Sequence, residues 1–110
     1  MNELIEQIFV DFMIPVAFLF YDGSATDYVT YRHVDSDNVL AADNRILNYV
    51  DYYDFDVFSK GNYFTYIEAL TERLTASGFI LQPSRCSNDM YEKDTKYYHK
   101  TLCFAIERSI

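Results

Sequence analysis

The feature that most constrains the fold is a strict alternation of side chains over residues 46–58. The large apolar members recur at every second position: Tyr53, Phe55 and Val57. Two carboxylates, Asp54 and Asp56, fall between them. Successive side chains of a β-strand point to opposite faces of a sheet, so the pattern predicts one long strand. We expect its aromatic face to be buried and Asp54 and Asp56 to point outward.

Two amphipathic helices are predicted on either side of this strand. Residues 2–13 carry apolar side chains at helical spacing: Ile5, Ile8, Phe9 and Phe12. Pro15 ends this helix, because the residue before a proline is pushed out of the helical conformation. Residues 63–77 carry a second stripe: Tyr63, Ile67, Leu70 and Leu74. Asn62 is suited to cap the start of the second helix, and Gly78 is suited to follow its end.

Four further strands complete the expected elements. The apolar run of residues 16–21 predicts a buried strand, and residues 27–34 predict the next one. Residues 79–86 and 96–107 predict a closing hairpin. Residues 35–44 have turn-forming residues at both ends and small apolar residues between them, so we expect a loop or a long hairpin connection there.

The expected order of elements is α-β-β-β-α-β-β within one domain of residues 1–110. Half of the 110 residues are hydrophobic and 24% are charged, a composition typical of a folded domain and not of a disordered chain. We therefore predict an α+β fold with a mostly antiparallel sheet and both helices on one face.

The charge narrows the choice of partners. Nine Lys and Arg residues against 17 Asp and Glu residues give a net charge of −8. Binding to the phosphate backbone of nucleic acids needs basic surface, and so does binding to anionic membranes, so we expect neither. No apolar run approaches the ~20 residues that span a bilayer. Since the sequence starts without the basic head of a signal peptide, we expect an intracellular, soluble protein.

No catalytic or metal-binding motif stands out in the sequence. Asp35, Asp37 and Asp43 superficially resemble a calcium loop, but the loop glycine and the final acidic residue are missing. The histidines and cysteines lack zinc-ligand spacing: His33, His99, Cys86 and Cys103. The expected hairpin places the two cysteines out of register, so we expect free thiols. We expect no enzyme activity, no catalytic or cofactor-binding residues, no cofactor and no metal.

Asp54 and Asp56 leave three interpretations open: a carboxylate pair for acid–base work, the polar side of a half-buried strand, or a charged rim that lines an assembly. The 11 tyrosines exceed what a core of this size needs. Because tyrosine is enriched at protein interfaces, some of them are candidates for contacts with partners.

Several short motifs in sequence order resemble a known family. They begin with Ile14–Phe18 after a first helix and continue through the stretches Tyr28–Tyr31, Ser36–Asn38, Ala42–Asn44 and Tyr53–Phe58. A Lys60-Gly61 break, a helix and a closing strand from Tyr98 to Ile106 follow. This order is similar to that of tail-terminator, or tail-completion, proteins in the head–tail region of long-tailed phages and prophages of Gram-positive bacteria.

The resemblance implies a structural protein of the virion, made in the host cytoplasm. Such proteins form a ring of about six copies by a heterologous contact that closes on itself. The ring caps the tail tube, joins it to the head–tail connector, and lets DNA pass without specific binding. A lumen lined by carboxylates such as Asp54 and Asp56 would repel the phosphates. The expected subunit interface lies in the connection with the apolar centre: Asp37, Asn38, Val39, Leu40, Ala42, Asp43 and Asn44.

Two alternatives remain at this stage. The same fold could serve as a head-completion or stopper protein in the connector. The chain could instead be a small acidic phage-encoded inhibitor that binds a host protein, although its acidic residues are spread along the sequence.

Overall fold

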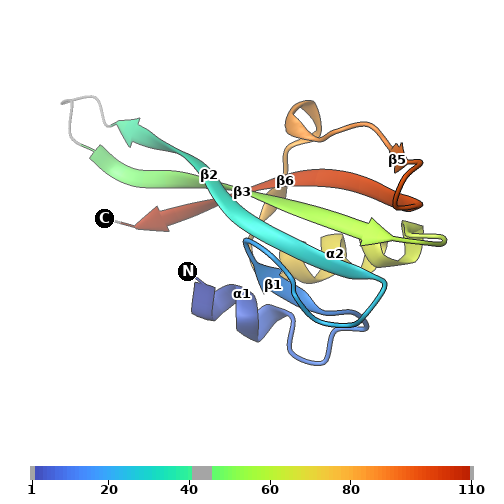
Figure 1. Cartoon of the computed structure of the whole chain (residues 1–110). Coiled ribbons are helices and arrows are strands. Elements are labelled where there is room, and N and C mark those ends of the chain that lie inside the picture. The colour runs from blue at the N-terminus through green and yellow to red at the C-terminus, as the bar shows by residue number, and fades with distance from the viewer. Residues whose placement is uncertain (1, 41–45, 110) are drawn as a thin grey trace.

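The computed structural model describes residues 2–40 and 46–109. The elements in chain order are α1 (Asn2–Ile8), β1 (Val16–Phe18), β2 (Tyr28–Leu40), β3 (Ile46–Ser59), α2 (Phe64–Ala76), β4 (Ile80–Leu81), the 3₁₀ turn η1 (Pro83–Arg85), β5 (Met90–Glu92) and β6 (Tyr97–Ser109). Figure 1 shows one sheet with α1 and α2 against one of its faces.

The strands form a six-stranded sheet in the order β1-β2-β3-β6-β4, and β5 pairs with β6. β1 and β2 run parallel, and the other strand pairs among the described residues are antiparallel. This confirms the predicted α+β class, the mostly antiparallel sheet and, apart from the additional short strand β5, the order of elements. The central strand β3 carries the alternating pattern.

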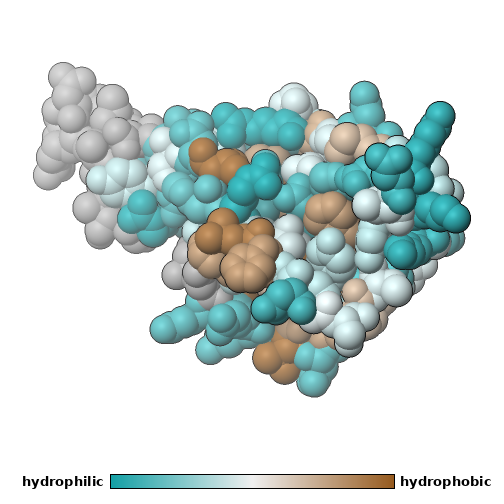
Figure 2. All heavy atoms as spheres, viewed as in Figure 1, coloured by the Kyte–Doolittle hydropathy of each residue, from teal (hydrophilic) through white to brown (hydrophobic). Residues whose placement is uncertain are grey.

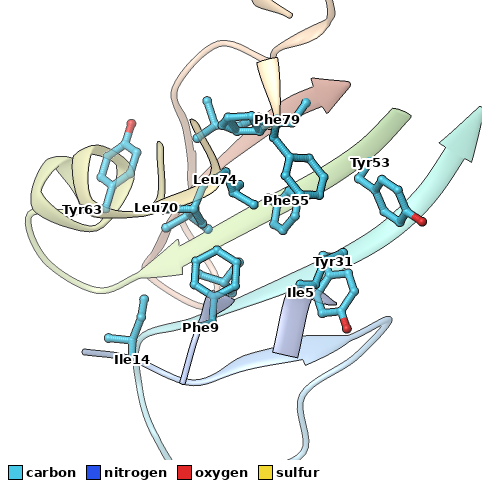
Figure 3. Close-up of a cluster of buried hydrophobic side chains, with 14 residues drawn as sticks. Ile5, Phe9, Ile14, Tyr31, Tyr53, Phe55, Tyr63, Leu70, Leu74 and Phe79 are labelled. Atoms are coloured by element: carbon cyan, nitrogen blue, oxygen red, sulfur yellow. The ribbon is translucent and has the colours of Figure 1, made fainter. Parts of the chain in front are cut away.

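The core lies between the helices and the inner face of the sheet, the face that carries Phe55. Figure 3 shows Phe9, directly after α1, together with Leu70 and Leu74 of α2, gathered around Phe55. Phe55 and its cross-strand partner Leu102 are buried, as predicted for the aromatic face of β3. Burial of apolar surface on this one face supplies the main driving force for folding.

The two helices end differently from each other. α1 is shorter than the predicted 2–13, because the chain turns at residues 9–11 and Asp11 has a positive φ of 62°. The Arg73 side chain of α2 donates to the backbone oxygens of Ile8 and Val10, which satisfies carbonyls at the end of α1. The close of α2 is as predicted: Gly78 has a φ of 97° and permits the left-handed turn that ends the helix.

The start of α2 lies one residue later than predicted. Tyr63 occupies the N-cap position, and Asn62 Oδ1 still accepts the backbone N–H of Phe64 at 3.0 Å.

The predicted closing hairpin differs from the observed structure. Only Ile80–Leu81 of the expected strand 79–86 pairs with β6, because Pro83 begins the η1 turn, and the short strand β5 takes up the next part of the β6 edge.

The apolar run 16–21 is not the buried strand that we expected. Only Val16–Phe18 pair with β2, and β1 is the edge strand of the sheet. Phe18 is exposed, and so are Leu19 and Phe20 after it. A run of apolar residues predicts burial equally for a central strand and for an edge strand, so the sequence pattern does not reveal which of the two it forms.

The predicted loop 35–44 is largely strand, and this is the main correction to the predicted fold. β2 continues to Leu40, and β3 starts at Ile46. A bulge at Val34 shifts the register, so that Asp35 pairs with Tyr52 whereas His33 pairs with Tyr53. Ladder pairing with β3 overrides the turn-forming composition, because β3 is itself paired with β6 along the same length.

Beyond the helices these strands form a projection that we call the arm: residues 35–40 of β2, 46–51 of β3 and 106–109 of β6. Figure 1 shows the arm extending away from the two helices. The molecule measures 53 × 27 × 22 Å, and its radius of gyration is 15.3 Å. A compact chain of this length has a radius of about 13 Å, so the arm makes the molecule markedly elongated.

Candidate functional site

The inner face of the arm is organised around one buried carboxylate. Asp51 is 3% exposed. Arg108 Nε donates to Asp51 Oδ2 at 2.8 Å, and the Ser36 hydroxyl donates to Asp51 Oδ1 at 2.7 Å. The Arg108 guanidinium also lies over the Tyr49 ring at 4.5 Å. These hydrogen bonds, with that of Arg108 first, hold the pKa of Asp51 below its usual value although burial opposes them.

His33 and Ser36 lie beside Asp51, but they do not form a nucleophile with its base. His33 Nε2 lies 2.8 Å from Ser36 Oγ and 3.7 Å from Asp51 Oδ1. The same imidazole nitrogen therefore faces both partners, and the Ser36 proton already points to the carboxylate. In a catalytic triad the carboxylate holds the other imidazole nitrogen. The cluster links the three strands of the arm, since its members come from β2, β3 and β6.

The outer face of the sheet carries the second polar cluster, around Asp54 and Asp56 of β3. Arg32 Nη1 donates to Asp56 Oδ2 at 2.8 Å, and Arg32 Nη2 donates to Asp54 Oδ2 at 3.1 Å. The Thr101 hydroxyl donates to Asp56 Oδ1, and His99 Nε2 lies 3.3 Å from the same oxygen. One arginine therefore joins both carboxylates, and β6 supplies the remaining partners of Asp56.

This arrangement refines the predicted acidic face. Asp54 and Asp56 share the outer face as expected, but Asp56 is only 6% exposed. Burial alone raises the pKa of Asp56, and the contacts of His99, Thr101 and Arg32 outweigh it, so the pKa lies below its usual value. The Asp56 carboxylate is therefore ionised, and it shares the positive charge of Arg32 with Asp54. Whether Asp54 and Asp56 line a lumen stays a prediction.

Aromatic rings cross the same outer face at the end away from the arm. Tyr21, Tyr28, Phe58 and His99 stack in sequence, with ring centroids 4.9, 4.9 and 4.3 Å apart. Protein platforms for single-stranded nucleic acids offer free ring faces to the bases. Here the faces of Tyr28 and Phe58 are taken up by neighbouring rings, so this row of rings acts as packing across the strands β2, β3 and β6.

The segment after β4 crosses the outer face and covers Cys103. Arg85 of η1 lies over the Tyr52 ring at 4.0 Å and reaches Asp35 at 3.5 Å. Cys103 is buried, which raises the pKa of its thiol to about 11. The Cys86 thiol is half-buried and donates to the Gln82 carbonyl oxygen at 3.3 Å. Both cysteines are free thiols, as predicted.

Among residues 2–40 and 46–109 no group of three potential ligands is placed to hold a metal ion. The two histidines lie on opposite faces of the sheet, because His33 pairs with Tyr53 on the inner face and His99 pairs with Phe58 on the outer face. Of the three aspartates that resemble a calcium loop, Asp35 contacts Arg85, and Asp43 lies outside the described residues.

The predicted subunit interface falls on the end of the arm. Asp37, Asn38, Val39 and Leu40 belong to β2 and pair with β3 between Val50 and Ile46. Ala42, Asp43 and Asn44 lie outside the described residues. The expected contact segment is therefore an ordered strand over Asp37–Leu40, and its role as an interface stays a prediction.

Sequence reasoning missed the partners that surround the carboxylates. Arg32 and Thr30 alternate along β2, and this spacing would have placed Arg32 opposite Asp54 had the hairpin register been known. Arg108 and Thr101 carry no comparable signal, because their proximity to Asp51 and Asp56 depends on the pairing of β6 with β3, about 45 to 57 residues apart in sequence.

Comparison with known protein families finds no match for the chain, and comparison with curated proteins finds none either. Within the part of the chain that the structure describes, the helices are too short and too polar to cross a membrane.

Proposed function

We propose that the chain is a structural virion protein at the head-proximal end of a phage tail. In this role it forms a ring of about six copies, ends the tail tube and joins it to the head–tail connector. The ring contacts the tail tube protein on one side and the connector protein on the other. DNA passes through it without specific binding.

The arm is the observation that carries this proposal. The arm is a set of paired strands that continues beyond the two helices. A projection of this kind supports the proposal because it extends the reach of one subunit over a neighbour. Its backbone is already ordered by ladder pairing from Asp35 to Leu40, so a contact would lose little conformational entropy on assembly.

The charge is compatible with a conduit for DNA. The net charge of −8 disfavours tight contact with phosphates. Two arginines of the sheet are paired with carboxylates: Arg32 with Asp54 and Asp56, and Arg108 with Asp51. We therefore predict no binding of duplex DNA at micromolar protein and physiological salt in a fluorescence anisotropy titration. Saturable binding under these conditions would contradict a passive conduit.

The substitution Leu40→Asp tests the arm as the contact. We expect the ring to be lost in size-exclusion chromatography with light scattering, while the isolated subunit keeps the melting temperature of the wild type. Phe64→Asp is the control, because it places the same charge on an exposed apolar residue of α2, outside the arm. A ring that survives Leu40→Asp would overturn the arm contact, and a monomeric wild type would overturn the proposed function itself.

A further inference from the structure

An open cavity lies where α1 and the chain that follows it meet β1 and Tyr31 of β2. Its volume is about 400 Å³, which is within the range of sites that bind small groups. Its wall is continuous with the core, because five apolar side chains line it: Ile5, Phe9, Phe12, Ile14 and Val16. No residue of the two polar clusters of the sheet lines this cavity.

A nearly buried hydroxyl opens into the cavity. Tyr31 belongs to the lining and is only 2% exposed, and its ring packs against those of Phe18 and Phe55. Figure 3 shows the Tyr31 hydroxyl pointing away from Phe55. None of the described residues forms a hydrogen bond with this hydroxyl. Every fully enclosed side-chain N or O atom of the described residues has a partner, so the hydroxyl reaches the open space that Tyr31 borders.

This hydroxyl keeps its proton and its hydrogen-bonding capacity. Burial raises the pKa of Tyr31, and the charge of Glu6 raises it further. The hydroxyl is therefore protonated at neutral pH, and it can donate one hydrogen bond and accept others. A polar group that is mostly withdrawn from water and lacks a protein partner is unfavourable, so a bound group that supplies the partner gains free energy there.

Two carboxylates border the same cavity. Glu6 of α1 and Asp11 of the following turn belong to its lining, and both are exposed. Among the described residues no Lys, Arg or His forms an ion pair with either of them. Arg73 of α2 lies over the Phe12 ring at 5.1 Å, but its Nη1 donates to backbone oxygens at the end of α1. The rim therefore keeps a negative charge that favours a cationic group.

Exposed apolar side chains extend the surface beyond the cavity. Met13 of the lining is exposed, and so is Phe18, which packs against Tyr31. Leu19 and Phe20 follow directly and are exposed as well. Figure 2 shows an apolar patch surrounded by hydrophilic residues in the region where Figure 1 places β1. Such patches mark contacts with proteins, and a free molecule small enough for the cavity would leave most of this one uncovered.

From these features we infer that the cavity binds a segment of a partner protein in which arginine or lysine stands next to large apolar side chains. An apolar side chain of the segment fills the cavity, and its backbone supplies a hydrogen-bond partner for the Tyr31 hydroxyl. The neighbouring cation meets Glu6 and Asp11. A deep apolar anchor with polar contacts around it is the usual centre of a protein contact. The inference goes beyond the proposed function, because this binding needs no ring.

Charge disfavours a second copy of the chain as the occupant. Residues 1–27 contain five Asp and Glu residues and no Lys or Arg, so two of these surfaces would repel each other. The whole chain has a net charge of −8, which also makes it a poor source of a basic segment. A basic segment of another protein avoids both kinds of repulsion.

Two hexapeptides with acetylated and amidated ends serve as probes. One is arginine-phenylalanine-leucine repeated twice, and the other carries citrulline, a neutral analogue, in place of each arginine. Titrations followed by saturation-transfer NMR measure the dissociation constants for the full chain in any oligomeric state. We expect a dissociation constant below about 1 mM for the arginine peptide and about fivefold weaker binding of the citrulline peptide.

Variants of the lining assign this difference to the rim of the cavity. In the double variant Glu6→Gln with Asp11→Asn the two peptides should bind equally, because the charges that distinguish them are gone. Glu3→Gln is the control, since it removes a carboxylate from the same helix outside the lining and should keep the difference. Tyr31→Phe should keep the melting temperature of the wild type and weaken the binding of both peptides about threefold.

Several outcomes would overturn the inference. These are equal binding of both peptides to the wild type, a difference that persists in the double variant, and the absence of binding up to about 10 mM peptide. If 4-phenylbutylamine binds as tightly as the arginine peptide, the cavity is a site for a small amine and not for a protein segment. An oligomer that the wild type forms and the double variant does not would make a second copy the occupant. The proposed ring depends on the solution mass and not on these titrations.

Discussion

The body of the sheet and the arm are built from the same three strands, yet they are held together differently. In the body, β2, β3 and β6 bury Tyr31, Phe55 and Phe104 beneath the two helices. The arm extends beyond the two helices (Figure 1), and its inner face carries the buried Asp51, bonded to Arg108 and Ser36. The strands are continuous, but the source of cohesion changes from apolar burial to charged hydrogen bonds.

The difference follows from what each region has to exclude from water. An apolar residue in the arm would bury less surface than one in the body, because the arm extends beyond the two helices (Figure 1). A buried carboxylate can instead accept hydrogen bonds from two neighbouring strands, and these bonds replace its hydrogen bonds to water. The body is therefore the source of stability, and the arm is a projection whose cohesion depends on a few polar contacts.

The largest expected effect comes from the body. Phe55→Ala removes a fully buried ring from the centre of the core, which should lower the free energy of unfolding by about 3–5 kcal/mol. Urea denaturation followed by circular dichroism measures the loss. A change below about 1 kcal/mol would show that the core is not centred on Phe55, and it would weaken the contrast between body and arm.

An intermediate effect is expected for Asp51→Asn in the arm. The substitution removes the charge that accepts the hydrogen bonds of Arg108 and Ser36. Because the Arg108 side chain is 48% exposed, we expect a loss of only about 1–2 kcal/mol. Hydrogen exchange should increase in the strands of the arm and stay unchanged around Phe55. Faster exchange throughout the sheet would show that the arm and the body unfold as one unit.

The smallest effect is the dependence of stability on acid pH. The pKa values of Asp51 and Asp56 are both below those of an unfolded chain. Their stabilising contribution is complete above the unfolded value of about 3.9 and is lost as the pH falls through the folded values. We expect the unfolding free energy to decrease below about pH 4, and to decrease less steeply in Asp51→Asn. A variant with the same acid profile as the wild type would exclude Asp51 as a contributor.

The sequence predicts the body better than the arm. The alternation over Tyr53, Phe55 and Val57 correctly identifies the buried face, since each of these side chains is buried. It does not identify the strand Asp35–Leu40, because turn-forming residues there are stabilised by pairing with β3 and not by their own propensity. The bulge at Val34 hides the register further, because it exchanges the faces of the residues from Asp35 to Val39, before a second register shift at Leu40.

The candidate site could be predicted only in part, because its contacts also depend on the strand register. Asp54 and Asp56 share a face as the alternation requires, but their pairing with Arg32 depends on the hairpin register. The exposed edge at Phe18 is the opposite of what its composition suggests. An apolar run indicates that a segment favours burial. It does not indicate whether the segment is buried by its own chain or by another one.

The solution mass of the wild-type protein tests the central claim most directly. In sedimentation velocity or light scattering over a wide range of protein concentration, we predict a single closed species of about six copies of the 13.0 kDa chain, without a continuous series of larger assemblies. A chain that stays at the monomer mass up to its highest soluble concentration would contradict a ring-forming structural protein.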